Sequence, residues 1–199
     1  MCLLIGAVLL SVALAGCASL RTPSRDSPEN GAIYGYFEIP KDSIGYLSDM
    51  SFFTYPPKVK AYFGRVSDLD YVIVDGAFFA YNAAPGSYFL QMIFATASDL
   101  FGTKTNQLEL IPVKAFDAET NNAMVQKNLI TVKSGELVFV GAREISLEKK
   151  PGFFSFQNGS FSIGPARSPS EKEILQKLSV RLKGTPWEAP AAARIAALQ

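Results

Sequence analysis

Few side chains in this sequence are suited to covalent or acid–base chemistry. The 199 residues include no histidine and only two cysteines, Cys2 and Cys17. The absence of histidine excludes Ser-His-Asp and Cys-His catalysis, histidine-ligated zinc and proton transfer by an imidazole. The chemistry that remains open uses a thiol, a serine–lysine pair or carboxylates.

The stretch from Ser146 to Lys149 has the S-x-x-K spacing, which sets a lysine base beside a serine nucleophile on one helical turn. These residues continue a strand-like run over 136–148, and strand positions three apart point to opposite faces of a sheet. The pattern therefore predicts no nucleophile here.

Three carboxylates, Asp68, Asp70 and Asp75, are oxygen ligands of the kind that calcium takes. No loop with ligand spacing surrounds them, and Asp75-Gly76 is better explained as a hairpin turn. The sequence therefore predicts no metal site and no cofactor.

Aromatic residues are concentrated in "SFFTYPPKVKAYF", residues 51–63, around Pro56-Pro57. Tyr55 and Tyr62 are the candidates for stacking on a sugar or a peptide if their rings are exposed. Alternating aromatic residues in strands more often belong to a core.

A thiol follows directly on an apolar run of about a dozen residues, Leu3 to Leu14, which is too short to span a membrane. With Leu14-Ala15-Gly16-Cys17, this segment resembles a bacterial lipoprotein signal peptide with its lipobox. The resemblance implies cleavage before Cys17, diacylglycerol on its thiol and acylation of the new amino terminus. The alternative is an ordinary signal peptide, or a buried N-terminal helix, with an incidental cysteine; the n-region, Met1-Cys2, carries no Lys or Arg.

The lipoprotein resemblance also implies a cellular location. Ala18 follows the cysteine, and in enteric bacteria a residue other than Asp at that position implies the outer membrane.

Removal of residues 1–16 leaves 183 residues, enough for one domain with a core but without a thiol for a disulfide. Lys and Arg total 19 against 18 Asp and Glu, so no nucleic-acid partner is indicated.

The chain divides into four parts by composition. Residues 1–16 are the signal peptide, 17–30 a lipidated flexible tether, 31–165 a β-sandwich domain and 166–199 a helical extension. Short β-prone runs with turns between them predict an antiparallel sandwich. The predicted strands are residues 31–39, 51–55, 58–64, 71–74, 77–81, 88–96, 107–113, 128–132, 136–148 and 153–163.

Two short helices are predicted near the C-terminus. The first has Ser168 as its N-cap, Pro169 at its first position and Glu171 closing a capping box, and it ends at Gly184. The second has a box from Thr185 to Glu188, but Pro190 indicates a later start. Their apolar stripes predict packing on the sandwich; the first stripe holds Ile174, Leu175, Leu178 and Leu182, and the second Trp187, Ala191, Ile195 and Leu198.

The stretch "DGAFFAYNAAPGSYFLQ", Asp75 to Gln91, contains D-G-x-F followed by P-G-x-Y-x-L. It resembles the carboxypeptidase regulatory-like domains, and the opening "GAIYG" at residues 31–35 fits their start. The resemblance implies a prealbumin-like (transthyretin-like) sandwich of about seven strands that is non-catalytic. The longer segment 44–70 and the C-terminal helices depart from the family pattern.

Together these observations predict a membrane-anchored, non-catalytic envelope lipoprotein that acts as a binding or structural module, not an enzyme. Its partners are the membrane, through lipid on Cys17, and an envelope protein or glycan. The alternative is a hydrolase of an envelope glycan that works with two carboxylates alone.

Overall fold

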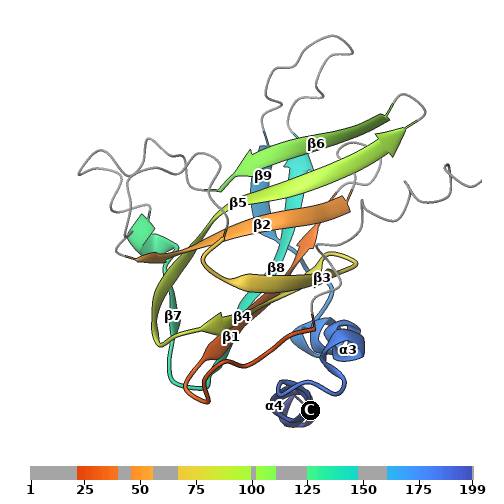
Figure 1. Ribbon diagram of the computed structural model, residues 1–199. Helices are drawn as coiled ribbons and strands as arrows, with labels where there is room; N and C mark the ends of the chain where they lie inside the picture. Colours follow the sequence, from red (N-terminus) through yellow and green to blue (C-terminus); the bar gives the residue numbers. More distant parts are fainter. Residues whose placement is uncertain are drawn as a thin grey trace, which may run out of the picture.

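Two β-sheets form the body of the protein (Figure 1). The computed structural model describes residues 22–39, 46–55, 67–99, 102–110, 125–147 and 161–198. The predicted strand at 58–64 lies outside these residues, as does most of the one at 153–163. The mainly-β prediction and the two-sheet sandwich are confirmed.

The first sheet has five strands in the order β3-β4-β1-β8-β9. All its neighbours are antiparallel except β1 and β8, which run parallel, so the all-antiparallel prediction is wrong at this pair. The bounds are β1 Gly31–Glu38, β3 Asp70–Val74, β4 Ala77–Ala83, β8 Leu137–Leu147 and β9 Phe161–Pro165.

The second sheet has four strands, with β5 between β2 on one edge and β6 and β7 on the other. The bounds are β2 Tyr46–Tyr55, β5 Gly86–Asp99, β6 Gly102–Glu109 and β7 Ile130–Val132. Strands β2, β5 and β6 begin earlier than the sequence indicated. A helical turn at residues 125–127 precedes β7.

The core between the sheets is built from alternate residues of each strand. In β4, Phe78 and Ala80 face the second sheet, where they meet residues such as Phe52 of β2 and Ile93 of β5. Phe78 is fully buried, and its ring lies 5.9 Å from that of Phe52. Phe78 therefore lies at the centre of the core between the sheets.

Strand β5 departs from simple alternation at Gln91. Strict alternation along a strand would place Tyr88, Leu90, Met92 and Phe94 on one face and Phe89, Gln91 and Ile93 on the other. A bulge leaves Gln91 unpaired with β2, because Ser51 pairs with Met92 and Phe52 with Leu90. The core therefore contains Tyr88 and Leu90 before the bulge, and Ile93 and Ala95 after it.

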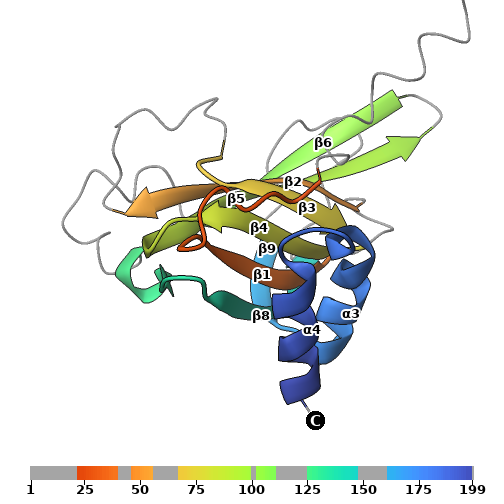
Figure 2. The same cartoon turned by 60° about the horizontal axis from the view of Figure 1, so that its bottom comes forward.

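The opposite face of the five-stranded sheet is covered by two helices, giving three layers (Figure 2). Helix α3 spans Glu171–Leu182 and α4 spans Glu188–Ala197. Residues from β1, β3 and β4 form a second core with both predicted apolar stripes, so the packing prediction is confirmed. This core contains Ala32, Tyr34, Val72, Ala77, Phe79, Tyr81, Ile174, Leu175, Leu178, Leu182, Trp187 and Ala191.

The start of α3 lies two residues later than predicted. Ser170, not Ser168, is the N-cap, and Glu173, not Glu171, completes the capping box. Ser168 and Ser170 each have a glutamate three residues later, so both fit the capping-box pattern. Glu171, the partner that Ser168 would need, makes other contacts instead. Its carboxylate accepts hydrogen bonds from Tyr34 at 2.5 Å and from Arg194 at 2.7 Å.

Helix α4 begins at Glu188, after Thr185 and Pro186. Trp187 occupies the N-cap position without a side-chain cap, while the Thr185 hydroxyl accepts a hydrogen bond from the Trp187 amide. Pro190 is thus the third helical residue, where its missing N–H costs no hydrogen bond. The later start indicated by Pro190 is confirmed. Gly184 ends α3 with φ 73°, as predicted.

Residues 22–30 differ from the predicted flexible tether, because they lie against the body. Pro23 is buried, and the carbonyl of Ser24 accepts a 2.7 Å hydrogen bond from the indole nitrogen of Trp187. Asn82 bonds both the Ser24 hydroxyl and the Asp26 amide. We call residues 22–30 the N-terminal strap.

The inter-sheet core sets the stability of the fold. We expect Phe78→Ala to lower the free energy of unfolding by about 3–5 kcal/mol, because it removes a large, fully buried side chain. Urea denaturation followed by the fluorescence of Trp187, the single tryptophan, measures this loss. Val180→Ala is the matched control; its side chain is 76% exposed, so the change is expected within about 0.5 kcal/mol. Equal effects of the two changes would contradict the placement of this core.

Candidate functional site

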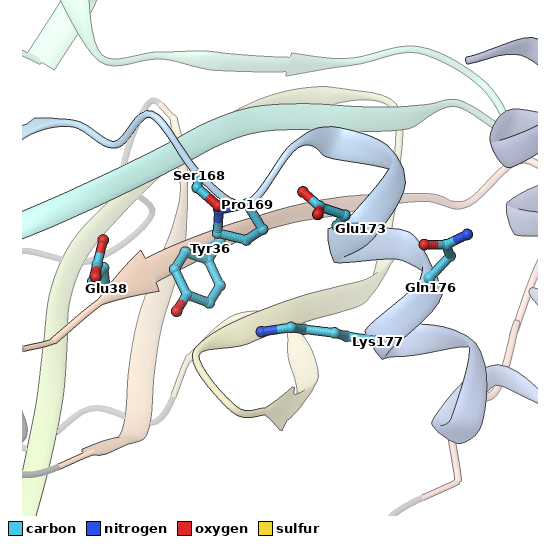
Figure 3. Close-up of a pocket in the computed structure, with 7 residues that line it drawn as sticks. All are labelled: Tyr36, Glu38, Ser168, Pro169, Glu173, Gln176 and Lys177. Atoms are coloured by element: carbon cyan, nitrogen blue, oxygen red, sulfur yellow. The ribbon is translucent and has the colours of Figure 1, made fainter. Parts of the chain in front are cut away.

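An open groove of about 600 Å³ lies between the end of β1 and the start of α3 (Figure 3). Its lining combines an aromatic ring, a proline ring and four kinds of polar group. The lining residues are Tyr36, Glu38, Ser168, Pro169, Glu173, Gln176 and Lys177.

The β1 side of the groove is positioned by the β3–β4 hairpin. Asp75 and Gly76 form its turn with φ 46° and 82°, as the sequence predicted. A Cβ on Gly76 would lie 2.6 Å from the Phe37 carbonyl and 2.9 Å from the Tyr36 ring. The backbone of the turn therefore lies directly against Tyr36 and holds its ring on the helix side of the sheet.

Lys177 and Tyr36 are in contact across the groove. The Lys177 ammonium lies 5.1 Å from the centroid of the Tyr36 ring, a cation–π distance. Burial, together with the carboxylates of Glu38 and Asp75, raises the pKa of Tyr36 above its ordinary value. The phenol thus stays protonated at neutral pH and can both donate and accept a hydrogen bond.

Glu173 is held ionised by its role in the capping box. Its carboxylate accepts hydrogen bonds from the Ser170 amide at 2.7 Å and the Ser170 hydroxyl at 2.8 Å. The backbone bond, the hydroxyl bond and nearby Lys177 lower the pKa of Glu173. A general acid needs the opposite shift, so Glu173 is unsuited to proton donation.

Of the two predicted stacking residues, Tyr55 alone lies among the residues that the structure describes. Tyr62 lies outside the described residues, and Tyr55 is half-buried beside the Phe53–Phe89 cluster, where its hydroxyl accepts a hydrogen bond from Gln126 at 2.9 Å. Cys17 also lies outside the described residues, so its lipidation stays a prediction.

Of the three carboxylates considered for calcium, Asp70 begins β3 and the other two have structural roles. Asp68 accepts hydrogen bonds from the amide and hydroxyl of Thr54 beside the edge of β2, and Asp75 lies in its hairpin. Within the described ranges, no group of three His, Cys, Asp or Glu side chains could hold a metal ion. Ser146 lies in β8, as predicted, while Lys149 is outside the described part.

Neither helix of the described chain is both long and apolar enough to cross a membrane.

The groove was not predicted from the sequence. Tyr36 and Lys177 are far apart along the chain, and only the packing of α3 on the sheet brings them together. The signal that could have found the α3 side is the Ser-Pro-Ser turn followed by Glu173 and Lys177, which lie four residues apart on one helix face.

The comparisons with known proteins give no relative for this chain: no family model, curated protein or solved structure matches it.

The capping box predicts a pH dependence of stability. Because folding lowers the pKa of Glu173 below its ordinary 4.5, this carboxylate stabilises the fold at neutral pH. That contribution is lost as the pH falls below 4.5 and through the folded-state pKa. Glutamine keeps the capping geometry without the charge, so we expect Glu173→Gln to lose less stability between pH 7 and about pH 3 than the wild type.

Urea denaturation at the two pH values measures this difference. Ser170→Ala is the companion variant and should cost about 1 kcal/mol at pH 7, because it removes the cap itself. An unchanged pH profile in Glu173→Gln would show that other carboxylates account for the acid sensitivity.

Proposed function

We propose that this chain is a membrane-anchored, non-catalytic envelope lipoprotein whose groove between β1 and α3 holds a polar ligand. The main evidence for a lipid anchor is the sequence Leu14-Ala15-Gly16-Cys17 at the end of a short apolar run. The described residues begin five residues after Cys17, with Thr22 of the strap, so a lipid on Cys17 would hold the domain at a membrane. Ala18 supports the outer membrane as that membrane.

The composition of the groove supports binding rather than catalysis. It contains two carboxylates, but Glu173 is committed to the cap and its pKa is lowered, whereas a glycosidase acid needs a raised one. The groove holds no cysteine, and its serine, Ser168, has no hydrogen-bonded base among the described residues. A carboxylate-dependent hydrolase is therefore the less supported function.

The prealbumin-like topology belongs to the same proposal. It is supported by the hairpin at Asp75-Gly76 and by the turn after Ala84, where the Tyr88 hydroxyl donates to the Ala84 carbonyl. Tyr88 and Leu90 follow in the inter-sheet core. In carboxypeptidase regulatory-like domains such a sandwich supports binding or spacing, which agrees with a non-catalytic module.

The ligand class that best suits the groove is an envelope saccharide. The Pro169 ring offers a flat apolar surface, as the face of a sugar ring does, and Tyr36, whose ring is covered on one face by the Lys177 ammonium, adds its hydroxyl. The carboxylate of Glu38, the amide of Gln176 and the ammonium of Lys177 supply acceptors and donors for hydroxyl groups.

The anchor is tested by changing Cys17. We expect Cys17→Ser to leave an uncleaved, non-acylated precursor, because lipid attachment to the thiol precedes cleavage. Intact-mass measurement on protein extracted from membranes distinguishes the two forms. Normal processing of Cys17→Ser would refute the lipoprotein proposal.

The groove is tested by calorimetric titration with N-acetylglucosamine oligosaccharides. We expect Gln176→Ala to weaken binding about 3- to 10-fold, the loss of one hydrogen bond. Gln176 is exposed, so the change leaves the fold intact. Ala193→Ser on the exposed side of α4 is the matched control and should bind like the wild type. If the wild-type protein does not bind these oligosaccharides, the saccharide assignment is refuted, whereas the proposed lipid anchor is unaffected.

A further inference from the structure

The N-terminal strap leaves the body at one end of the helical layer. Ser24 is held by the indole of Trp187, which lies in the turn between α3 and α4, and Pro23 beside it is buried. The helices run antiparallel, so this turn and the C-terminus lie at opposite ends of the layer (Figure 2). The groove lies at the same end as the start of α3, away from the turn.

The distance from this exit point to the proposed lipid is short. Thr22 is five residues from Cys17, and a fully extended chain of that length spans at most about 18 Å. This step rests on the proposed lipidation of Cys17. Given that anchor, Thr22, which is two residues before the Ser24 that is bonded to Trp187, must lie within about 18 Å of the lipid surface.

The surface beside this exit has the side chains of a membrane contact. Val180 is 76% exposed, one of only two large apolar side chains so exposed in the described residues. Arg181 follows it in the last turn of α3, and Lys183 is the C-cap of the helix. We call Val180, Arg181 and Lys183 the α3–α4 corner.

Among the described residues, neither Arg181 nor Lys183 forms an ion pair. Glu171 is paired with Arg194, Glu173 is used in the capping box, and Glu188 accepts a hydrogen bond from the Gly184 amide. Glu171 and Glu173 are thus engaged at the other end of α3, while Glu188 lies beside Lys183 through its bond to the Gly184 amide, so two basic residues face one carboxylate at the corner. By contrast, Arg25 of the strap faces inward, with its guanidinium 4.9 Å from the centroid of the Trp187 ring.

We propose that the α3–α4 corner rests on the anionic headgroups of the bilayer that holds the Cys17 lipid. Each Lys or Arg near an anionic surface contributes about 1 kcal/mol, and the exposed valine can enter the interface. Helix α3 is 12 residues long and rises about 18 Å, so the groove at its other end faces the aqueous phase. The corner thereby orients the groove away from the membrane.

The test places one thiol-reactive fluorophore at each end of the helical layer. After acylation of Cys17 the mature chain has no free thiol, so Val180→Cys and the exposed control Ala197→Cys, at the end of α4, are each labelled uniquely. The acylated protein is reconstituted in vesicles of phosphatidylethanolamine and phosphatidylglycerol. We expect headgroup-nitroxide lipids to quench the label at position 180 at least about twofold more than that at position 197.

Charge variants identify the lipid chemistry. Arg181→Glu with Lys183→Glu should abolish the difference in quenching, and so should vesicles of phosphatidylcholine alone, because anionic attraction is lost. Lys172→Glu, at the far end of α3, is the matched control and should keep the difference.

Several outcomes overturn the orientation. Equal quenching at positions 180 and 197 would show that the corner does not contact the bilayer. Shielding of position 180 from soluble iodide in lipid-free detergent micelles would indicate a second copy of the chain or a protein on the corner. Failure of the protein to float with the vesicles, or an unmodified mass, would instead refute the anchor.

Discussion

The structure depends on one sheet that is apolar on both faces. Strands β1 and β4 send alternate residues to two cores, so that Phe78 packs towards the second sheet and Phe79 towards the helices. Such a sheet would be unstable with one face in water, because its large apolar side chains would be exposed to solvent. The C-terminal helices are therefore part of the fold rather than an appendage. Tyr34 of β1, Glu171 of α3 and Arg194 of α4 form the polar link in this layer, and burial together with Glu171 raises the pKa of Tyr34, which keeps it a hydrogen-bond donor.

Local patterns predicted most of the elements, because their signals lie within a few residues. The run "AFFAY" is apolar at every position, as a strand buried on both sides must be, and Asp75-Gly76 marked its hairpin. The stripe from Ile174 to Leu182 predicted the buried face of α3. The exact cap was ambiguous, since Ser168 and Ser170 each precede a glutamate by three residues. Only the engagement of Glu171 by Tyr34 and Arg194 separates them, and those contacts are invisible in local sequence.

Long-range features could not be predicted in the same way. The parallel pairing of β1 with β8 joins segments that are distant in the chain, and the bulge at Gln91 depends on the register of β2 against β5. Gln91 is fully buried, and neither polar atom of its amide has a hydrogen-bond partner among the described residues. The groove has the same origin, because Tyr36 and Lys177 meet only after α3 packs on the sheet. Aromatic content alone directed attention to Tyr55, whose hydroxyl is already bonded to Gln126.

The contact between the strap and Trp187 has a mechanical consequence. A pull on the segment before Thr22 reaches the Trp187–Ser24 bond and the two Asn82 bonds before it reaches the ladder of β1. Further along the strap, the Gly135 amide donates to the Glu29 carbonyl at 2.8 Å, which adds a tie to the turn before β8. Traction is thus shared among the helical layer, β4 and the β7–β8 turn. A force applied at the amino-terminal end therefore acts on these contacts first, and the hydrogen bonds that hold β1 in the sheet are protected from it.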